Sequence, residues 1–173
     1  MRRSLTHIVE IDEKALAAAR AVIACVELES VRIIHSRFVT SMPTLPTTPI
    51  ELATTSRTEE SIDGESLYVV LDLALRGFKK EDVVLDVNAR IEAVYSIPAD
   101  ATFSPYQMKC FAKANGMLNV WPYWRDFVQS TVQRAGLPAL TLPLFRVIHK
   151  RRVRNVAAVN QSLVVGKTGL PKT

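Results

Sequence analysis

Cysteine and histidine are too scarce in this sequence to form a recognisable metal centre or redox motif. Among 173 residues there are two cysteines, Cys25 and Cys110, which lie far apart and form no CxxC pair. The three histidines, His7, His35 and His149, have neither metal-ligand spacing nor a nucleophile elbow beside them. We therefore predict no metal and no cofactor. We expect both cysteines to be reduced core residues, with a disulfide left open if the protein is exported.

A phosphate-binding loop and a membrane-spanning run are also missing. Gly166-Lys167-Thr168 matches only the end of a phosphate loop, because position 161 is not glycine and too few residues follow for the required helix. No apolar run approaches the roughly 20 residues that a membrane span needs. The apolar stretch before Cys25 resembles a lipoprotein signal, but acidic residues precede it and Arg20 interrupts it. These absences favour a cytoplasmic binding protein over an enzyme.

Positive charge is concentrated at the C-terminal end. The chain has a net charge of +5, whereas residues 146–173 hold seven Lys or Arg and no acidic residue, so residues 1–145 carry −2. The basic run 149–154 has the charge to contact nucleic-acid phosphates or an acidic protein surface, but no aromatic residues interleave it. We predict a basic, flexible tail at 146–173, and the sequence leaves open whether it is merely solvated or acts as an electrostatic arm.

The N-terminal part is predicted to be a helical extension, residues 1–30, followed by a strand. Asp12 can cap a helix that continues through alanine-rich sequence to about Glu29, with Glu13 in its first turn. Over residues 31–39 β-branched residues replace the helical period, which indicates a strand. Prolines at 43, 46 and 49 then exclude regular pairing, and residues 50–55 could add a short strand.

Two strands with nearly unbroken alternation follow, and they predict an antiparallel hairpin. Residues 67–76 place leucine or valine at every odd position up to Leu75, and residues 83–97 place an apolar residue at every odd position, with mostly polar even positions. The turn is expected within residues 77–82. Asp72, Asp86 and Glu92 lie on the polar faces, where we interpret them as solvated strand residues rather than acid-base catalysts. A sheet with one apolar face requires a cover.

Helical sequence supplies that cover. Ser104-Pro105 predicts a helix start, and Asn115-Gly116 predicts its end. A second helix is expected from Trp121-Pro122 to Gly136, with a wide apolar face that suggests contact with both the sheet and another surface. Residues 139–145 alternate in the manner of an extended arm.

The second helix and the arm carry a resemblance to a known family. Residues 119–126, Asn-Val-Trp-Pro-Tyr-Trp-Arg-Asp, followed by 134–142, Arg-Ala-Gly-Leu-Pro-Ala-Leu-Thr-Leu, resemble the SecB export chaperones, in which a similar helix runs into a Gly-x-Pro-x-Leu-x-Leu exit. The resemblance covers about residues 31–145, and only its last third is specific. It implies an α+β fold, a SecB-like four-stranded antiparallel sheet covered by C-terminal helices, here with an extra N-terminal helix.

The same resemblance implies a function. SecB-like proteins assemble as dimers of dimers and bind unfolded client polypeptides without nucleotide, for protein export or, in divergent members, to protect an antitoxin of a toxin-antitoxin system. Docking to the SecA motor is in doubt here, because a basic tail stands where an acidic one is typical. We expect the client-binding or oligomer surface to include nine residues: Trp121, Tyr123, Trp124, Phe127, Val128, Leu140, Leu142, Leu144 and Phe145. The alternative is a nucleic-acid-associated or regulatory module that acts through the basic tail.

Overall fold

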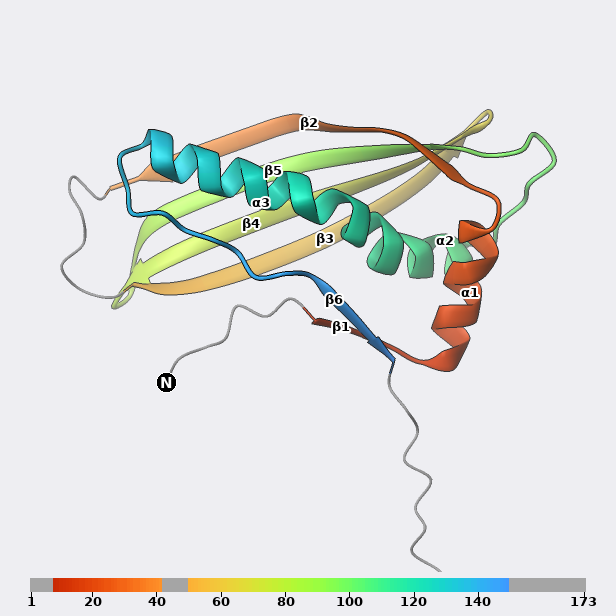
Figure 1. Cartoon of the computed structure of the whole chain (residues 1–173), viewed down its shortest axis with the longest axis horizontal. Helices are drawn as coiled ribbons and strands as arrows, with labels where there is room; N and C mark the ends of the chain where they lie inside the picture. Colours follow the sequence, from red (N-terminus) through yellow and green to blue (C-terminus); the bar gives the residue numbers. More distant parts are fainter. Residues whose placement is uncertain (1–7, 42–49, 150–173) are drawn as a thin grey trace, which may run out of the picture.

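The computed structural model describes residues 8–41 and 50–149, and these form an α+β fold around one antiparallel sheet (Figure 1). The sheet has the order β2-β5-β4-β3. Its strands are β2 (Glu27–Thr40), β3 (Glu51–Asp63), β4 (Ser66–Lys79) and β5 (Asp82–Ser96). Helix α3 (Met117–Arg134) crosses one face of the sheet, and helices α1 (Glu13–Ile23) and α2 (Pro105–Phe111) pack together near one end (Figure 1).

The predicted hairpin is confirmed by β4 and β5, which pair along almost their whole length. Odd-numbered residues from Leu67 to Leu75 and from Leu85 to Ile97 are buried under the helices, whereas Val83 beside the turn is exposed. The turn itself is tighter than expected. It lies between Lys79 and Asp82, with Lys80 at a φ of 58°, and the chain before it is already part of β4.

The first helix and its neighbouring strands differ from the sequence prediction in length. Helix α1 ends at Ile23 rather than near residue 29, and β2 begins at Glu27, because pairing of residues 27–30 with β5 overrides their helical propensity. β3 runs for 13 residues instead of the short strand expected at 50–55. Cys25 therefore lies exposed in the turn after α1 and Cys110 is half-buried, so the expectation that both cysteines are core residues is wrong.

One nearly continuous helical segment replaces the two separate helices that the sequence predicted. The start is as expected: Ser104 caps α2 in a capping box with Gln107, and Pro105 is in its first turn. The predicted end at Asn115-Gly116 is wrong, because residues Ala112–Gly116 form a π-helical turn that continues into α3. Pro122 consequently lies inside α3 rather than at its start.

A second, two-stranded sheet joins distant parts of the chain. Strand β1 (Ile8–Ile11) pairs in parallel with β6 (Arg146–His149), beyond β3 in the view of Figure 1. Neither strand was predicted, and β6 occupies the first four residues of the segment assigned to the basic tail. The rest of that segment, 150–173, lies outside the described residues, as does His7. The division into domains at 30 and 145 stays a prediction.

The buried phenol of Tyr95 links the sheet to α3 and provides a first test of the packing. Its hydroxyl accepts a hydrogen bond from the side-chain amide of Asn119 at 3.0 Å, and its ring meets Phe111 edge-on with centroids 5.0 Å apart. Burial raises the pKa of the Tyr95 phenol above its usual value of 10, and the hydrogen bond from Asn119 partly opposes that rise. The neutral phenol is thus the form that the fold accommodates.

We expect Tyr95→Phe to lower the free energy of unfolding by about 1 kcal/mol at neutral pH, because the Asn119 amide loses its acceptor. A raised folded pKa means that the stabilisation by the neutral phenol is present below pH 10 and is lost as pH rises through the folded pKa. The stability difference between wild type and variant should therefore shrink above pH 10. Urea unfolding at pH 7 and pH 10.5 measures it, and a difference that is constant with pH contradicts the assignment.

Candidate functional site: an apolar surface beside strand β2

The C-terminal arm, residues 139–145, packs along one side of α3. The indole Nε1 of Trp121 donates to the carbonyl of Pro143 at 2.9 Å, and Nε of Arg125 donates to the carbonyl of Leu142 at 2.8 Å. The rings of Trp121 and Phe145 lie 5.7 Å apart. These contacts satisfy two side-chain donors and make the arm a part of the hydrophobic core.

The structure separates the nine residues of the predicted client or oligomer surface into two groups. Five are buried within the chain itself and contribute to its core: Trp121, Trp124, Val128, Leu142 and Phe145. The other four reach the surface. Tyr123 and Leu144 are exposed, and Phe127 and Leu140 are half-buried. Which of these four meets clients or subunits stays a prediction, but the buried five are available to neither without unfolding.

Tyr123 and Phe127 lie on the side of α3 that faces away from the arm. Val120, Trp124 and Val128 form the buried stripe of α3, and Arg125 lies on the side of that stripe that faces the arm. At 100° of rotation per residue, Tyr123 and Phe127 lie on the other side of the stripe. Figure 1 shows β2 on this side of α3 and the arm on the other. The aromatic ring of Phe127 stacks on that of Trp124 with centroids 6.0 Å apart, which fixes its position at the margin of the core.

Strand β2 presents apolar side chains on the same side of the sheet. Leu28 pairs opposite Tyr95 and Ile33 opposite Ile91, so both point to the face that the helices cover. Both are nevertheless 41% exposed, because α3 lies mainly over β5 and leaves the edge of the sheet open. We call this set, Leu28, Ile33, Tyr123 and Phe127, the β2 surface.

The backbone of β2 is open as well. β2 is the outermost strand of its sheet and pairs only with β5, so among the described residues its other row of N–H and C=O groups has no strand partner. Ile34 and Val39, both 44% exposed, add apolar side chains along this edge. The free outer edge of a long strand is a template for another polypeptide. The β2 surface therefore combines apolar contacts with main-chain pairing.

Two of the four residues of the β2 surface were missed by sequence reasoning. Leu28 was assigned to the end of the first helix, and Ile33 was placed in a strand without any sign that this strand forms an edge. The β-branched run at 31–39 was a correct signal for strand, but edge position depends on which strands pair, and pairing is a long-range property.

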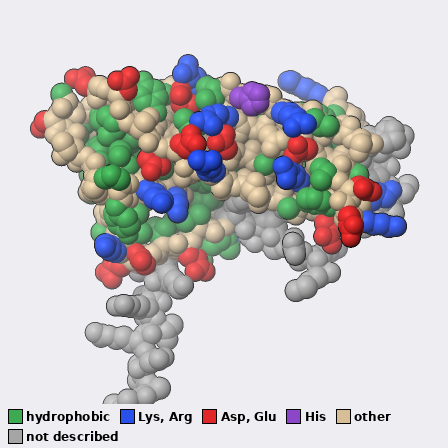
Figure 2. Space-filling view, turned by 180° about the vertical axis from the view of Figure 1, so that it is seen from behind, with side chains coloured by type: hydrophobic (Ala, Val, Ile, Leu, Met, Phe, Trp, Pro, Cys, Tyr) green, Lys and Arg blue, Asp and Glu red, His purple; other side chains and the backbone are tan. Residues whose placement is uncertain are grey.

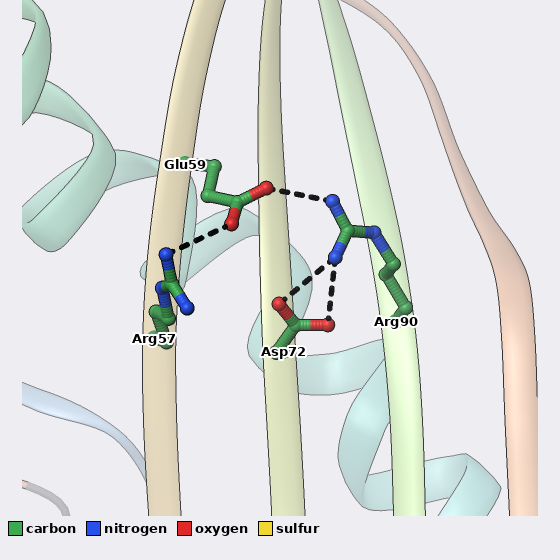
Figure 3. Close-up of polar contacts among 4 residues, drawn as sticks. All are labelled: Arg57, Glu59, Asp72 and Arg90. Atoms are coloured by element: carbon green, nitrogen blue, oxygen red, sulfur yellow. Dashed lines mark hydrogen bonds and ion pairs between the residues drawn. The ribbon is translucent and has the colours of Figure 1, made fainter.

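The opposite face of the sheet is uncovered and charged. Figure 2 shows Lys, Arg, Asp and Glu side chains grouped over it. Arg90 donates to both carboxylate oxygens of Asp72 and to Glu59, and Glu59 also contacts Arg57 at 3.3 Å (Figure 3). The hydrogen bond to Glu59, with the charge of Asp72, raises the pKa of the Arg90 guanidinium. Asp72 is thus an ion-pairing residue of an exposed strand face.

Among residues 8–41 and 50–149, no three potential metal-ligating side chains from His, Cys, Asp or Glu lie close enough to hold an ion. None of the helices formed by these residues has the length and apolar character of a transmembrane segment.

Comparison with solved structures identifies the fold. The chain superposes on a Mycobacterium tuberculosis SecB-like chaperone in complex with a ChAD peptide from the HigA1 antitoxin, with a TM-score of 0.69 and 15% sequence identity over 76% of this chain and 99% of that chain. A protein of unknown function from Streptococcus agalactiae gives a TM-score of 0.42 at 11% identity, over 69% of this chain and 97% of that one. No family model and no curated protein matches the sequence.

The first of these superpositions confirms the predicted fold. The chain has a SecB-like α+β fold with a four-stranded antiparallel sheet, C-terminal helical cover and an additional N-terminal helix. At 15% identity this likeness establishes the fold alone.

Proposed function

We propose that this protein is an ATP-independent holdase chaperone that binds unfolded or aggregation-prone polypeptides in the cytoplasm through the β2 surface. The observation that carries the proposal is a set of accessible apolar side chains, Leu28 and Ile33 on β2 with Tyr123 and Phe127 on the facing side of α3, next to the unpaired outer edge of this 14-residue strand. The proposed role needs no catalytic residue, because the client is held rather than modified.

The physical basis of such binding is compatible with many client sequences. Where no subunit occupies the edge of β2, main-chain hydrogen bonds to it depend on the client backbone and not on its side chains. Apolar client side chains that leave water contribute about 25 cal/mol per Å² of buried area. The phenol of Tyr123 adds a hydrogen-bonding group at the rim of the strip. Together these interactions favour extended, apolar segments, which folded proteins do not expose.

A homo-oligomer, in the predicted form of a dimer of dimers, is part of the proposal. The unpaired edge of β2 suits a second copy of the chain as well as it suits a client, since both supply a strand. We propose that subunits pair through the edge of β2 and that clients contact the apolar side chains left accessible around it. The exposed arm residue Leu144, 62% exposed, and half-buried Leu140 would extend this contact on the other side of α3.

For the client we propose either an export preprotein or a cognate antitoxin. The antitoxin peptide bound to the M. tuberculosis SecB-like chaperone supports a peptide client for this fold. Docking to SecA through an acidic surface is not part of the proposal. On the open sheet face Asp72, Asp86 and Glu92 each contact an arginine, so their charges are locally compensated. The alternative, a nucleic-acid module acting through the basic tail, rests on residues outside the described part of the chain.

We expect the purified protein to suppress aggregation of a chemically denatured client, measured by light scattering, without ATP. The double variant Leu28→Ser/Ile33→Ser should suppress several-fold less, because it removes two apolar contacts of the β2 surface while leaving the core intact. Val83→Ser is the matched control, since Val83 is 48% exposed beside the β4–β5 turn and away from this surface.

Sedimentation of both variants separates clients from subunits. If the double variant becomes smaller than the wild type and loses activity, the edge of β2 is a subunit contact on which binding depends. If it keeps the wild-type size and loses activity, Leu28 and Ile33 contact clients directly. A wild-type protein that suppresses no aggregation at stoichiometric excess refutes the holdase proposal.

A further inference from the structure

The uncovered face of the sheet is organised in rows of side chains that cross all four strands from β3 to β2. Pairing register defines three adjacent rows: Arg57, Asp72, Arg90 and His35; Thr55, Ala74, Asn88 and Arg37; and Ala53, Arg76, Asp86 and Val39. The first and third rows contain ion pairs. The middle row has a small residue at its centre, Ala74, flanked by uncharged Thr55 and Asn88.

This difference in side-chain size leaves a hollow over the middle row. It has a volume of about 410 Å³ and is lined by residues of all four strands, among them His35, Thr55, Arg57, Ala74, Asn88 and Arg90. The lining includes the small side chain of Ala74 and the longer side chains of the first row. Because it is open to solvent, the hollow is unlike the enclosed apolar pockets that hold small molecules. It suits a side chain presented by another protein.

Hydrogen-bond donors lie around the hollow, and the ion pairs engage only some of them. Arg57 makes one 3.3 Å contact, to Glu59, and its side chain is 77% exposed. Arg37 pairs opposite the lining residue Asn88 and so lies beside the hollow. Its side chain is 64% exposed, and its 4.0 Å approach to Asp86 is too long for a hydrogen bond. Within the described residues, the side chains of Thr55 and Asn88 have no hydrogen-bond partner. A guanidinium has five N–H donors, so both arginines retain most of theirs.

The charges around the hollow select among anions. Four arginines, Arg37, Arg57, Arg76 and Arg90, face three carboxylates, Glu59, Asp72 and Asp86, which leaves a net charge of +1. A polyanion such as a nucleic acid would bring phosphates close to these carboxylates, and the like charges would repel. Carboxylate groups that are spaced apart on a ligand can bind the free guanidinium donors without approaching the carboxylates of the protein. Arginine forks match carboxylates in bidentate geometry.

We propose that this hollow, on the face opposite the helices, binds an acidic segment of a partner protein, with Arg57 and Arg37 each receiving one carboxylate and Asn88 and Thr55 contacting the chain between them. Arg57 and Arg37 belong to β3 and β2, three strand spacings apart, and stand in neighbouring rows, so their Cα atoms are about 16 Å apart. Residues i and i+4 of an extended segment span about 14 Å, and the long arginine side chains cover the remaining distance. The preferred ligand is therefore an extended peptide with acidic residues four positions apart.

The test uses the full chain and the peptide acetyl-Glu-Ser-Thr-Ser-Glu-amide, titrated into ¹⁵N-labelled protein at low salt and followed by NMR. We expect shifts of the amides of Thr55, Arg57 and Asn88, and affinity at least about tenfold weaker for Arg37→Gln/Arg57→Gln, because each loss removes a charge-assisted hydrogen bond. Arg20→Gln is the control, since Arg20 is exposed on helix α1 and is not part of the sheet.

Three results would overturn the proposal: no shifts at millimolar peptide, equal binding of the peptide with both Glu replaced by Gln, or tighter binding of a five-nucleotide single-stranded DNA than of the acidic peptide. The proposal is independent of the holdase function, because it concerns the other face of the sheet. In the aggregation assay the single variant Arg57→Gln, on β3 at the other edge of the sheet, should perform as the wild type does, so failure of either proposal leaves the other testable.

Discussion

Trp124→Ala is expected to lower the free energy of unfolding by about 3–5 kcal/mol, which is a large part of the stability of a domain of this size. The indole is 1% exposed and is among the largest fully buried side chains. It belongs to the cluster that joins α3 to the buried faces of β4 and β5, and it stacks on Phe127. Truncation removes this apolar contact area and leaves a cavity that the surrounding strands cannot close without losing their register.

Tyr123→Ala is the matched control, because its residue is adjacent in sequence but 47% exposed. Its effect on stability should remain within about 0.5 kcal/mol. In the aggregation assay, Tyr123→Ala should have a larger effect than Trp124→Ala, since Tyr123 belongs to the β2 surface. Urea unfolding followed by circular dichroism measures both stabilities. Equal losses for the two variants would contradict the division of the aromatic helix into a core side and a surface side.

Gly116→Ala should destabilise the fold by about 1–3 kcal/mol through overpacking. A Cβ built at Gly116 would lie 2.7 Å from Cγ1 of Val69, and Val69 is fully buried on β4. A β-branched side chain in the core has no free rotamer into which it could withdraw. The absence of a side chain at Gly116 is what allows the π-helical turn to approach the sheet, and thermal unfolding of the variant tests this close approach.

Adding Val69→Ala to the Gly116→Ala variant should restore part of the stability that Gly116→Ala loses. If the clash is with Cγ1 of Val69, the double variant will be more stable than the sum of the single variants by roughly 0.5–3 kcal/mol. Gly64→Ala is the control: Gly64 has a φ of 58° and no atom within 4 Å of its added Cβ, so its cost comes from the backbone and Val69→Ala cannot relieve it. Additive effects at positions 116 and 69 would exclude the steric explanation.

Local patterns in the sequence predicted the central hairpin, the capped start of α2 and the apolar face of α3 that packs on the sheet correctly. Each depends on interactions between residues that are close along the chain. Alternation at odd positions from Leu67 to Leu75 shows which face is buried without information about its cover. Ser104 and Gln107 form their capping box within one helical turn. The residues around Trp121 also carried the resemblance that predicted a SecB-like fold.

The errors arose where distant residues decide the conformation. Asn115-Gly116 is typical of a helix end, but close packing of Gly116 against Val69 accommodates a π-helical turn instead. Residues 27–30 resemble the continuation of a helix until β5 is available to pair with them. The parallel pairing of β1 with β6 joins segments more than a hundred residues apart, and four-residue strands carry too little pattern to be detected.

The sequence by itself determined the fold class, through the resemblance to the SecB family, and the central hairpin and aromatic helix, because periodicity and capping are encoded within a few neighbouring residues. Only the tertiary structure decided which aromatic and aliphatic residues remain at the surface. Trp124 and Tyr123 are equally plausible contact residues in a linear sequence, and their exposure differs because α3 turns one toward β4 and β5 and the other toward the rim beside β2. The β2 surface exists because strand order leaves β2 at an edge, and strand order results from long-range pairing.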